Sequence, residues 1–267
     1  MMNLRKIVGI IAVIAILGFV FLSCEEESAG TTSYGETLKL SGQVFKAAES
    51  NLSWTDIAAI NTAKDFEKAI NEYYNADPVK FTGTVKVSYG EKEGTITNGT
   101  LSFEMGAPNA DDLYAINSYI ESLTEDGYKE AKVDKTDAKI YVLYGLQVKD
   151  SDDYNYVGRG KSSGKYSIKN DGSFTGKFNS DSIVYIYVTD AVKVTAKGYP
   201  DVDGLETTTY KDINLSLKKG WNVVKSSYSG DEKGTSFTSL LGVGTGVTST
   251  GTVTITTGDS GTQWMIH

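Results

Sequence analysis

Alternation of apolar and polar residues along short segments limits the fold of this chain more than any other feature. In FTGTVKVSY (81–89), Phe81, Val85, Val87 and Tyr89 fall on one side, and threonine, lysine and serine fall on the other. The same alternation recurs in LKLSGQV (38–44), TLSFEM (100–105), VKVTA (192–196), DINLSLK (212–218) and TVTITT (252–257). A period of two puts alternate side chains on opposite faces of a strand, so each segment predicts a strand with one buried and one solvated face.

Turn sequences separate these segments. They are EKEG (91–94), TNG (97–99), NDG (170–172) and KKG (218–220). Glycine accepts the positive φ angles of tight turns, so each stretch predicts a turn between strands. For KKG we predict a hairpin, with Trp221 packed beside it. The chain holds 28 glycines and 17 tyrosines but only three prolines, which favours strands and turns. We therefore predict a mainly β fold made of antiparallel β-sandwich modules.

Two segments have helical spacing instead. The segment near 62–74 carries Phe66, Ile70 and Tyr73 at helical intervals, and Asp77-Pro78 ends the pattern. The segment 111–123 places Leu113, Ile116, Ile120 and Leu123 on one side, with aspartates in its first turn. Helices are therefore expected only in the N-terminal part of the chain.

Their position suggests two modules. Residues 37–135 form a β-rich module with the two helices, and residues 136–267 form an all-β sandwich module. The boundary falls in the charged stretch EAKVDKTDAK (130–139). A single continuous sandwich is the alternative that the sequence leaves open.

The N-terminus has the layout of an export signal. Arg5 and Lys6 precede an uncharged apolar stretch from Ile7 to Leu22, which ends just before the single cysteine, Cys24. A transmembrane helix needs about 20 apolar residues, and this stretch is shorter. The acidic, Ser- and Gly-containing residues 24–36 lack apolar periodicity and predict a flexible tether.

The stretch FLSC (21–24) resembles the lipobox of bacterial lipoproteins, most closely in the relaxed form common in spirochaetes. The resemblance implies that residues 1–23 are a signal peptide, cleaved between Ser23 and Cys24, and that Cys24 carries the lipid. Its partner would be the lipid bilayer, because two or more acyl chains suffice for stable anchoring. It implies a location in the cell envelope, at the outer membrane or cell surface rather than the inner membrane.

Four further phrases resemble surface lipoproteins of spirochaete and Bacteroidetes type. They are LKLSGQV, GTITNGTLSFEMGAP, DINLSLKKGWNVV and GTQWMIH. The resemblance implies β-sandwich or immunoglobulin-like (Ig-like) modules displayed on a membrane, and it carries no catalytic residues. The Cys…Trp…Cys signature of true immunoglobulin domains is absent, so "Ig-like" means a sandwich and nothing closer.

Charge and residue counts argue against several activities. Loss of Arg5 and Lys6 with the signal would take the formal net charge from −8 to about −10, which disfavours nucleic acid as a partner. The single histidine is His267, at the end of the printed chain, and the single cysteine is assigned to lipidation. Histidine- or cysteine-based catalysis and transition-metal binding are therefore not expected, nor is a cofactor.

Acidic residues leave two weaker possibilities. The loops DSDDYN (150–155) and DVDGLE (201–206) gather the oxygen ligands that calcium prefers, but neither completes an EF-hand loop. Solvated acidic turns are the favoured interpretation, and no metal site is predicted. A glycosidase would need two carboxylates about 5–10 Å apart across a cleft, and no local pattern selects such a pair.

Tyrosines are the candidates for ligand contact. In SIVYIYVT (182–189), Tyr185 and Tyr187 share a face with Ile183, opposite an aliphatic face that predicts core. The tyrosine face fits either a second covered surface or a ligand-contacting strip. Tyr154 and Tyr156 lie in an expected loop, where binding residues concentrate.

These observations predict a non-enzymatic, membrane-anchored lipoprotein that displays β modules for contact with a host or envelope protein or a glycan. The role would be adhesin-like or structural. The alternatives are a β-scaffold carrier of a small apolar ligand and, less favoured, a carboxylate-dependent glycosidase. A carrier requires a closed apolar pocket, whereas a contact module exposes aromatic side chains.

Overall fold

The computed structural model describes residues 35–46, 60–125, 128–149, 151–237 and 247–267. The predicted signal peptide, its cleavage site at Ser23 and Cys24, and nearly all of the predicted tether lie outside these residues. The described part is mainly β, with a fifteen-stranded sheet and a three-stranded sheet. No helix in the described ranges combines the length and the hydropathy needed to cross a bilayer.

Seven strands of the large sheet pair in a closed circuit. In order of pairing they are β1 (Leu38–Lys46), β5 (Thr100–Met105), β4 (Lys92–Thr97), β3 (Val85–Tyr89), β9 (Leu146–Lys149), β10 (Tyr156–Ile168) and β18 (Gln263–Ile266). The circuit closes because β10 pairs with both β9 and β18. β1 and β18 run parallel, with Val44 opposite Trp264, so the beginning and the end of the described chain lie side by side.

The sheet continues from β10 through its longest strands. These are β11 (Phe174–Val188), β16 (Gly220–Gly234) and β17 (Thr248–Thr257), followed by β14 (Glu206–Tyr210) and β13 (Pro200–Asp203). The short strands β8 (Lys139–Leu143), β6 (Tyr114–Ala115) and β2 (Val79–Lys80) pair at its borders. The second sheet contains β15 (Ile213–Leu217), β12 (Val192–Gly198) and β7 (Tyr128–Val133).

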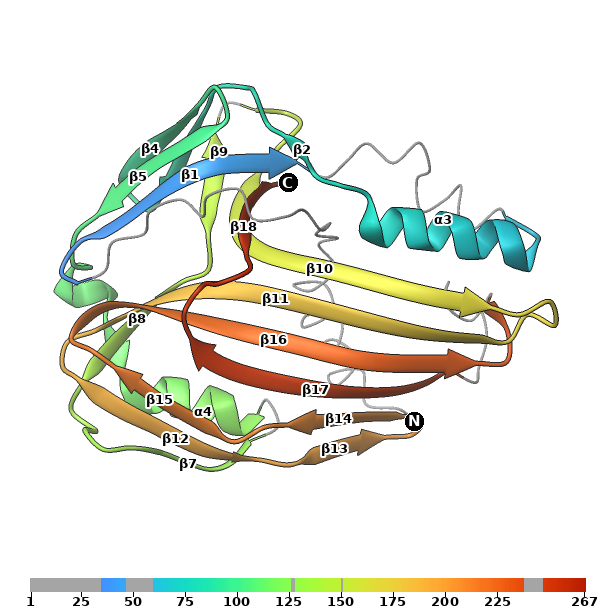
Figure 1. Ribbon diagram of the computed structural model, residues 1–267. Coiled ribbons are helices and arrows are strands. Elements are labelled where there is room, and N and C mark those ends of the chain that lie inside the picture. The colour runs from blue at the N-terminus through green and yellow to red at the C-terminus, as the bar shows by residue number, and fades with distance from the viewer. Residues whose placement is uncertain (1–34, 47–59, 126–127, 150, 238–246) are drawn as a thin grey trace.

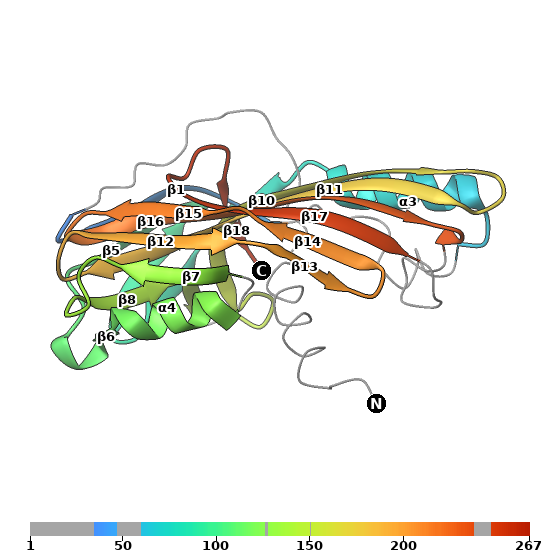
Figure 2. The ribbon, with the colours of Figure 1, turned by 90° about the horizontal axis from the view of Figure 1, so that it is seen from below.

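Three layers pack together at one end of the molecule, which we call the core end (Figures 1 and 2). Ile183, Tyr185 and Tyr187 of β11 face the closed circuit, in a cluster that includes Trp221 and Trp264. Ile186 and Val188 face the opposite way, toward the three-stranded sheet and helix α4 (Ile116–Glu125). β11 is thus buried on both faces at the core end.

Beyond the core end, β10, β11, β16 and β17 extend as a ribbon, with helix α3 (Ala63–Asn75) along β10 (Figure 1). The part of β11 that precedes Ile183 in the chain belongs to this ribbon. Phe66, Ala69 and Ile70 of α3 pack against Tyr166, Ile168 and Phe174 in a separate buried cluster. The ribbon therefore has its own small core.

The strand predictions are confirmed, except that in FTGTVKVSY (81–89) the strand β3 begins only at Val85. The mainly β class with antiparallel pairing is also confirmed. The strand order does not establish the finer, Ig-like arrangement. The predicted module boundary at 135/136 needs correction, because strands from the two sides pair: β1 with β18, β3 with β9 and β7 with β12. The two segments share both sheets, as in the single continuous sandwich.

The helix near 62–74 is confirmed as α3, whose first turn is capped because the Asp65 backbone N–H donates to the Thr62 hydroxyl at 3.2 Å. The second helix begins later than predicted. Residues Ala110–Asp112 form a 3₁₀ turn, η1, and Tyr114–Ala115 pair with β8 before α4 starts at Ile116. Strand pairing displaces the first helical turn.

EKEG, TNG and NDG each lie at a turn between paired strands, as predicted. In the β4–β5 hairpin, Asn98 and Gly99 have φ angles of 49° and 76°, as a type I′ turn requires. The prediction for KKG (218–220) is wrong, because β15 pairs with β12 whereas β16 pairs with β11. The turn carries the chain from one sheet to the other. Trp221 is nevertheless buried, and its Nε1–H donates to the Gly106 carbonyl at 3.1 Å.

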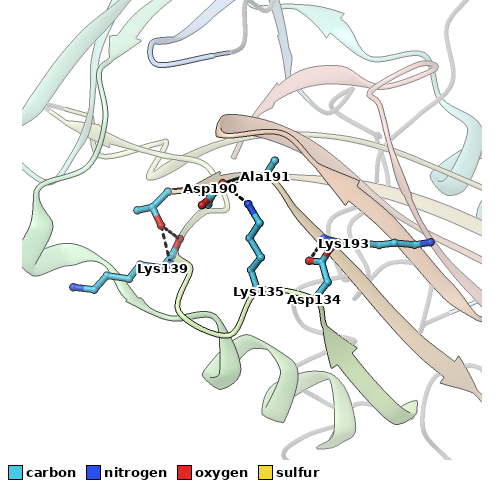
Figure 3. Close-up of polar contacts among 7 residues, drawn as sticks. Asp134, Lys135, Lys139, Asp190, Ala191 and Lys193 are labelled. Carbon is cyan, nitrogen blue, oxygen red and sulfur yellow. Dashed lines mark hydrogen bonds and ion pairs between the residues drawn. The ribbon is translucent and has the colours of Figure 1, made fainter.

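Two loops at the core end are fastened to each other by polar contacts (Figure 3). Lys135 Nζ lies 2.7 Å from Asp190 Oδ1, and the Lys193 backbone N–H donates to Asp134 Oδ1 at 2.8 Å. The Lys139 backbone N–H donates to the Thr189 hydroxyl at 2.9 Å. These contacts join the β7–β8 loop to the β11–β12 loop and so hold the adjoining strand ends together.

Candidate functional site

Tyr185 and Tyr187, two of the four tyrosines predicted to contact a ligand, lie inside the core. Tyr185 is fully buried and stacks on Trp264, with ring centroids 6.1 Å apart. Tyr187 is 6% exposed and packs edge-on against Trp221 at 5.6 Å. The tyrosine face of β11 is therefore the second covered surface, because the closed circuit packs against it.

Tyr154 and Tyr156 are both half-buried. Tyr154 packs edge-on against Phe81 at 5.4 Å, at the border of the main core. Tyr156 donates its hydroxyl to the Tyr144 carbonyl at 2.8 Å. Through this bond Tyr156 belongs to a larger group of tyrosines at the surface.

This group, which we call the tyrosine patch, is brought together from five elements of the chain. Tyr89 ends β3, Tyr114 lies in β6, Tyr141 in β8, Tyr144 between β8 and β9, and Tyr156 begins β10. Tyr144 is 61% exposed and Tyr114 is 39% exposed, whereas the other three are half-buried. The patch therefore presents two exposed rings on a partly buried aromatic base.

The segment VLYGL (142–146) explains why Tyr144 points outward. Leu143 and Leu146 are fully buried on either side, and they hold the connection against the core. A Cβ atom at Gly145 would lie 2.2 Å from the Tyr156 hydroxyl, so only glycine lets that ring lie close to the backbone. The exposed tyrosine is thus held by fixed neighbours.

The base of the patch connects to the core through aromatic contacts. Tyr89 packs edge-on against Tyr141 with centroids 5.9 Å apart, and Tyr141 packs edge-on against Trp221 at 6.1 Å. Trp221 is 2% exposed. Such edge-to-face pairs have favoured geometry, so the patch is preorganised rather than assembled on binding.

Three hydroxyls of the patch, those of Tyr114, Tyr141 and Tyr156, stay neutral at physiological pH. Burial, together with the nearby Tyr144 and Tyr89 hydroxyls, raises the pKa of Tyr114 to about 12. Burial also raises the pKa of Tyr156 to about 12, and it raises the pKa of Tyr141, which is additionally hydrogen-bonded with Tyr89. The patch thus offers ring faces and neutral hydroxyls, which suit sugars and protein surfaces alike.

A pair of carboxylates, as a glycosidase would use, is the next candidate for a functional site. Burial raises the pKa of Glu232, which accepts the Tyr166 hydroxyl at 3.0 Å, and the charge of Glu206 raises it further. Two depressions stand out, of about 460 and 360 Å³, and neither is lined by these two glutamates. The arrangement therefore does not place a carboxylate pair across either depression, as a glycosidase would need.

The acidic loops do not form a cluster of ligands in the described structure. Asp150 lies outside the described residues, while Asp152 and Asp153 are exposed beside Ser151. The second loop, 201–206, is the β13–β14 hairpin, with Gly204 at φ 62°. Within the described ranges, no three His, Cys, Asp or Glu side chains gather as a metal site would require.

His267 is held by its backbone. Its carbonyl accepts the N–H groups of Asn155 and Tyr156, and its N–H donates to the Tyr156 carbonyl at 2.9 Å. Burial lowers the pKa of its imidazole to about 4, so the ring is neutral at pH 7.

Sequence reasoning identified Tyr156 but missed Tyr89, Tyr114, Tyr141 and Tyr144. The local signal for Tyr144 is a tyrosine between buried leucines, beside a glycine. Nothing local links the five segments, because they meet only through strand pairing. Comparison of the chain with protein-family models, with curated proteins and with solved structures finds no match.

Proposed function

We propose that this protein is a non-enzymatic, membrane-anchored lipoprotein that contacts a glycan or a protein through its tyrosine patch. One observation carries the contact role: Tyr144 and Tyr114 are exposed side by side with three half-buried tyrosines. Exposed aromatic clusters mark interaction sites, because tyrosine buries a large area and still offers a hydroxyl. The role is adhesin-like or structural within the cell envelope.

The anchor in this proposal rests on the sequence. Export would remove residues 1–23, and acylation of Cys24 would hold the chain in a bilayer, at the outer membrane or cell surface. Residues 24–36 would then separate the folded part from the lipid headgroups. This places the tyrosine patch where it can meet ligands outside the membrane.

Three features favour contact over the alternative functions. The main core is filled by its own large side chains, among them Trp221, Trp264 and Tyr185, whereas a carrier of an apolar ligand needs an enclosed cavity. The two depressions are lined mostly by polar side chains and are open to solvent. Tyrosine hydroxyls with a pKa of about 12 are also poorly matched to acid–base catalysis at neutral pH.

The contact role is tested on arrays of glycans and of host and envelope proteins. The probe is the mature chain 24–267 with Cys24→Ser, which removes the lipid. The double variant Tyr114→Ala/Tyr144→Ala should weaken binding to any ligand found by about tenfold or more, with an unchanged melting temperature. Val202→Ala, which truncates a 64% exposed side chain elsewhere, is the matched control. Absence of any ligand, or undiminished binding by the double variant, would reject the proposal.

The anchor is tested separately. Cys24→Ala should abolish acylation and leave an unprocessed precursor, because the attachment thiol is gone. Ser23→Ala keeps a small residue before the cysteine, so it should be processed normally. Equal processing and equal partitioning into detergent by Cys24→Ala and the parent would contradict the lipoprotein assignment.

A further inference from the structure

The solvent-facing side of the ribbon concentrates positive charge. Cross-strand partners point to the same face, so the pairing of β10, β11 and β16 identifies its members. Four lysines belong to it, namely Lys161, Lys165, Lys177 and Lys233, and Lys225, which lies opposite Ile183, borders it at the core end. The carboxylates on the same face are Asp181 and Asp231, so these four lysines and Lys225 against two aspartates give +3. The whole chain carries −8. We call this surface the lysine face.

Neutral polar groups fill the spaces between these charges. Ser163 and Asn179 are cross-strand partners, and Asn179 pairs in turn with Ser229. The next strand, β17, adds Thr252 opposite Ser229 and Thr250 opposite Asp231. Strands lie about 4.8 Å apart, so hydroxyl and amide groups form regular rows beside the lysines.

Part of this arrangement works against stability. Lys165 lies directly opposite Lys177, and like charges in that position repel. Lys177 has Asp231 at 3.7 Å and Lys225 has Asp181 at 3.6 Å, whereas Lys161, Lys165 and Lys233 form no ion pair with any described residue. Local rules of this kind are broken mainly at functional sites, where a ligand supplies the missing partner.

A depression of about 360 Å³ lies where the lysine face meets the core end. Lys161, Asn179, Asp181 and Lys225 line it, together with Ser260 and Gly261 of the β17–β18 loop. Its volume is at the lower end of the range of small-molecule sites. Lys225 Nζ lies 3.6 Å from Asp181 Oδ2, so the recess combines this ion pair with the Lys161 ammonium group and the Asn179 amide.

The loop that walls this depression is fastened from beneath. The guanidinium of Arg159, whose side chain is 1% exposed, pairs with Asp259 at 2.5 Å. The Thr262 hydroxyl donates to the Asp259 carbonyl at 2.6 Å, and Arg159 also lies over the Trp264 ring. The wall is therefore set before any ligand arrives, which lowers the entropic cost of binding.

We propose that the lysine face binds an acidic polysaccharide, with the chain laid across the strands and one carboxylate-bearing sugar in the depression. Charge complementarity argues for an anionic ligand, since the ammonium groups of Lys161, Lys165 and Lys233, which lack an ion pair within the described part of the chain, attract carboxylates. The intervening serine, threonine and asparagine side chains match a ligand rich in hydroxyls. An anionic bilayer would need only the charges, and a nucleic acid would favour stacking rings, which the lysine face lacks. This proposal goes beyond the role of the tyrosine patch and does not depend on it.

Binding to polygalacturonate tests the proposal, with neutral dextran and phosphatidylglycerol vesicles as the other ligands. The protein is again the mature chain 24–267 with Cys24→Ser, so that lipid binding reports the protein surface alone. Lys161→Gln/Lys165→Gln/Lys177→Gln should weaken polygalacturonate binding by about tenfold or more and reduce its salt dependence. The control Lys132→Gln/Lys193→Gln/Lys211→Gln removes the same charge from exposed positions elsewhere and should bind as the parent does.

A folding defect is separated by the single variant Lys165→Gln. It relieves the repulsion with Lys177, so its melting temperature should be unchanged or higher while polygalacturonate binding falls. Three results would overturn the proposal: no binding by the parent, equal loss in both triple variants, or preference for phosphatidylglycerol vesicles. Tyr114→Ala/Tyr144→Ala should keep full polygalacturonate binding, which distinguishes failure here from failure of the tyrosine patch.

Discussion

The core end and the ribbon are built from the same long strands but are stabilised in different ways. At the core end, β11 reads SIVYIYV (182–188), and apolar side chains cover both of its faces. In the ribbon, the same strand reads FTGKFNSD (174–181), and its exposed residues are threonine, lysine and asparagine. A single strand can therefore pass from a three-layer core into a ribbon with one covered face, and residues 181–183 mark the transition.

The edge of β10 shows the same contrast. At the core end, β18 pairs with β10 at Val157–Gly160. Farther along β10, side chains of α3 instead form the hydrogen bonds to this edge. Asn71 Nδ2 donates to the Tyr166 carbonyl at 2.7 Å, and the Tyr166 N–H donates to Asn71 Oδ1 at 2.7 Å. Glu67 accepts the Ile168 N–H at 2.6 Å, and Asn75 donates to the Gly164 carbonyl. Residues spaced by four on the helix thus satisfy an edge that could otherwise pair with another chain.

Truncation of Trp221 should have the largest effect on stability, because it removes a large buried side chain from the core end. Trp221 is 2% exposed and contacts Tyr141 and Tyr187. We expect Trp221→Ala to lower the free energy of unfolding by about 3–5 kcal/mol, measured by chemical denaturation. Lys219→Ala is the control, since its side chain is exposed and lies 3.9 Å from Glu36, and it should change stability by less than about 0.5 kcal/mol. An unaltered midpoint for Trp221→Ala would show that this residue does not support the core.

Removal of Asn71 should have an intermediate effect and should act on the ribbon alone. Asn71→Ala leaves the N–H and the carbonyl of Tyr166 without their side-chain partner, at a cost of about 1–3 kcal/mol. The bared edge should also promote association, visible as a concentration-dependent shift in sedimentation. Glu72→Ala, at an exposed position on the same helix, is the control. A monomeric Asn71→Ala with parental stability would show that α3 does not protect the edge.

Local patterns in the sequence predict local structure well in both regions. Alternation identifies β1, β3, β5, β12, β15 and β17, the pair Asn98-Gly99 identifies a hairpin, and Thr62 marks the start of α3. Each depends on neighbours within a few residues, so a single sequence contains the necessary information. The segment SIVYIYVT even indicates that β11 has two apolar faces.

Contacts between distant segments could not be predicted in this way. The parallel pairing of β1 with β18 joins Val44 to Trp264, and no local pattern encodes that register. KKG (218–220) has the composition of a hairpin turn, yet the pairing of β15 and β16 with different strands makes it a crossover. The tyrosine patch depends on five such segments, which explains why only Tyr156 was found from the sequence.

The smallest predicted effect concerns Glu232, a carboxylate with a raised pKa on the covered side of the ribbon. Burial raises the pKa of Glu232 above that of a free glutamate, and Glu206 adds repulsion. Both states are protonated at low pH, so the group costs nothing there, and stability is lost as the pH rises through the folded-state pKa. Glu232→Gln should therefore stabilise the protein at pH 7, by less than about 1 kcal/mol, and the gain should vanish near pH 4. The Tyr166 hydroxyl can still donate to the side-chain amide oxygen of the Glu232→Gln variant.

The control is Asp231→Asn, which lies next to Glu232 in the chain but on the exposed face, and it should give no such gain. Thermal melts at both pH values decide the matter, and a Glu232→Gln protein less stable than the parent at pH 7 would mean that the ribbon needs this charge.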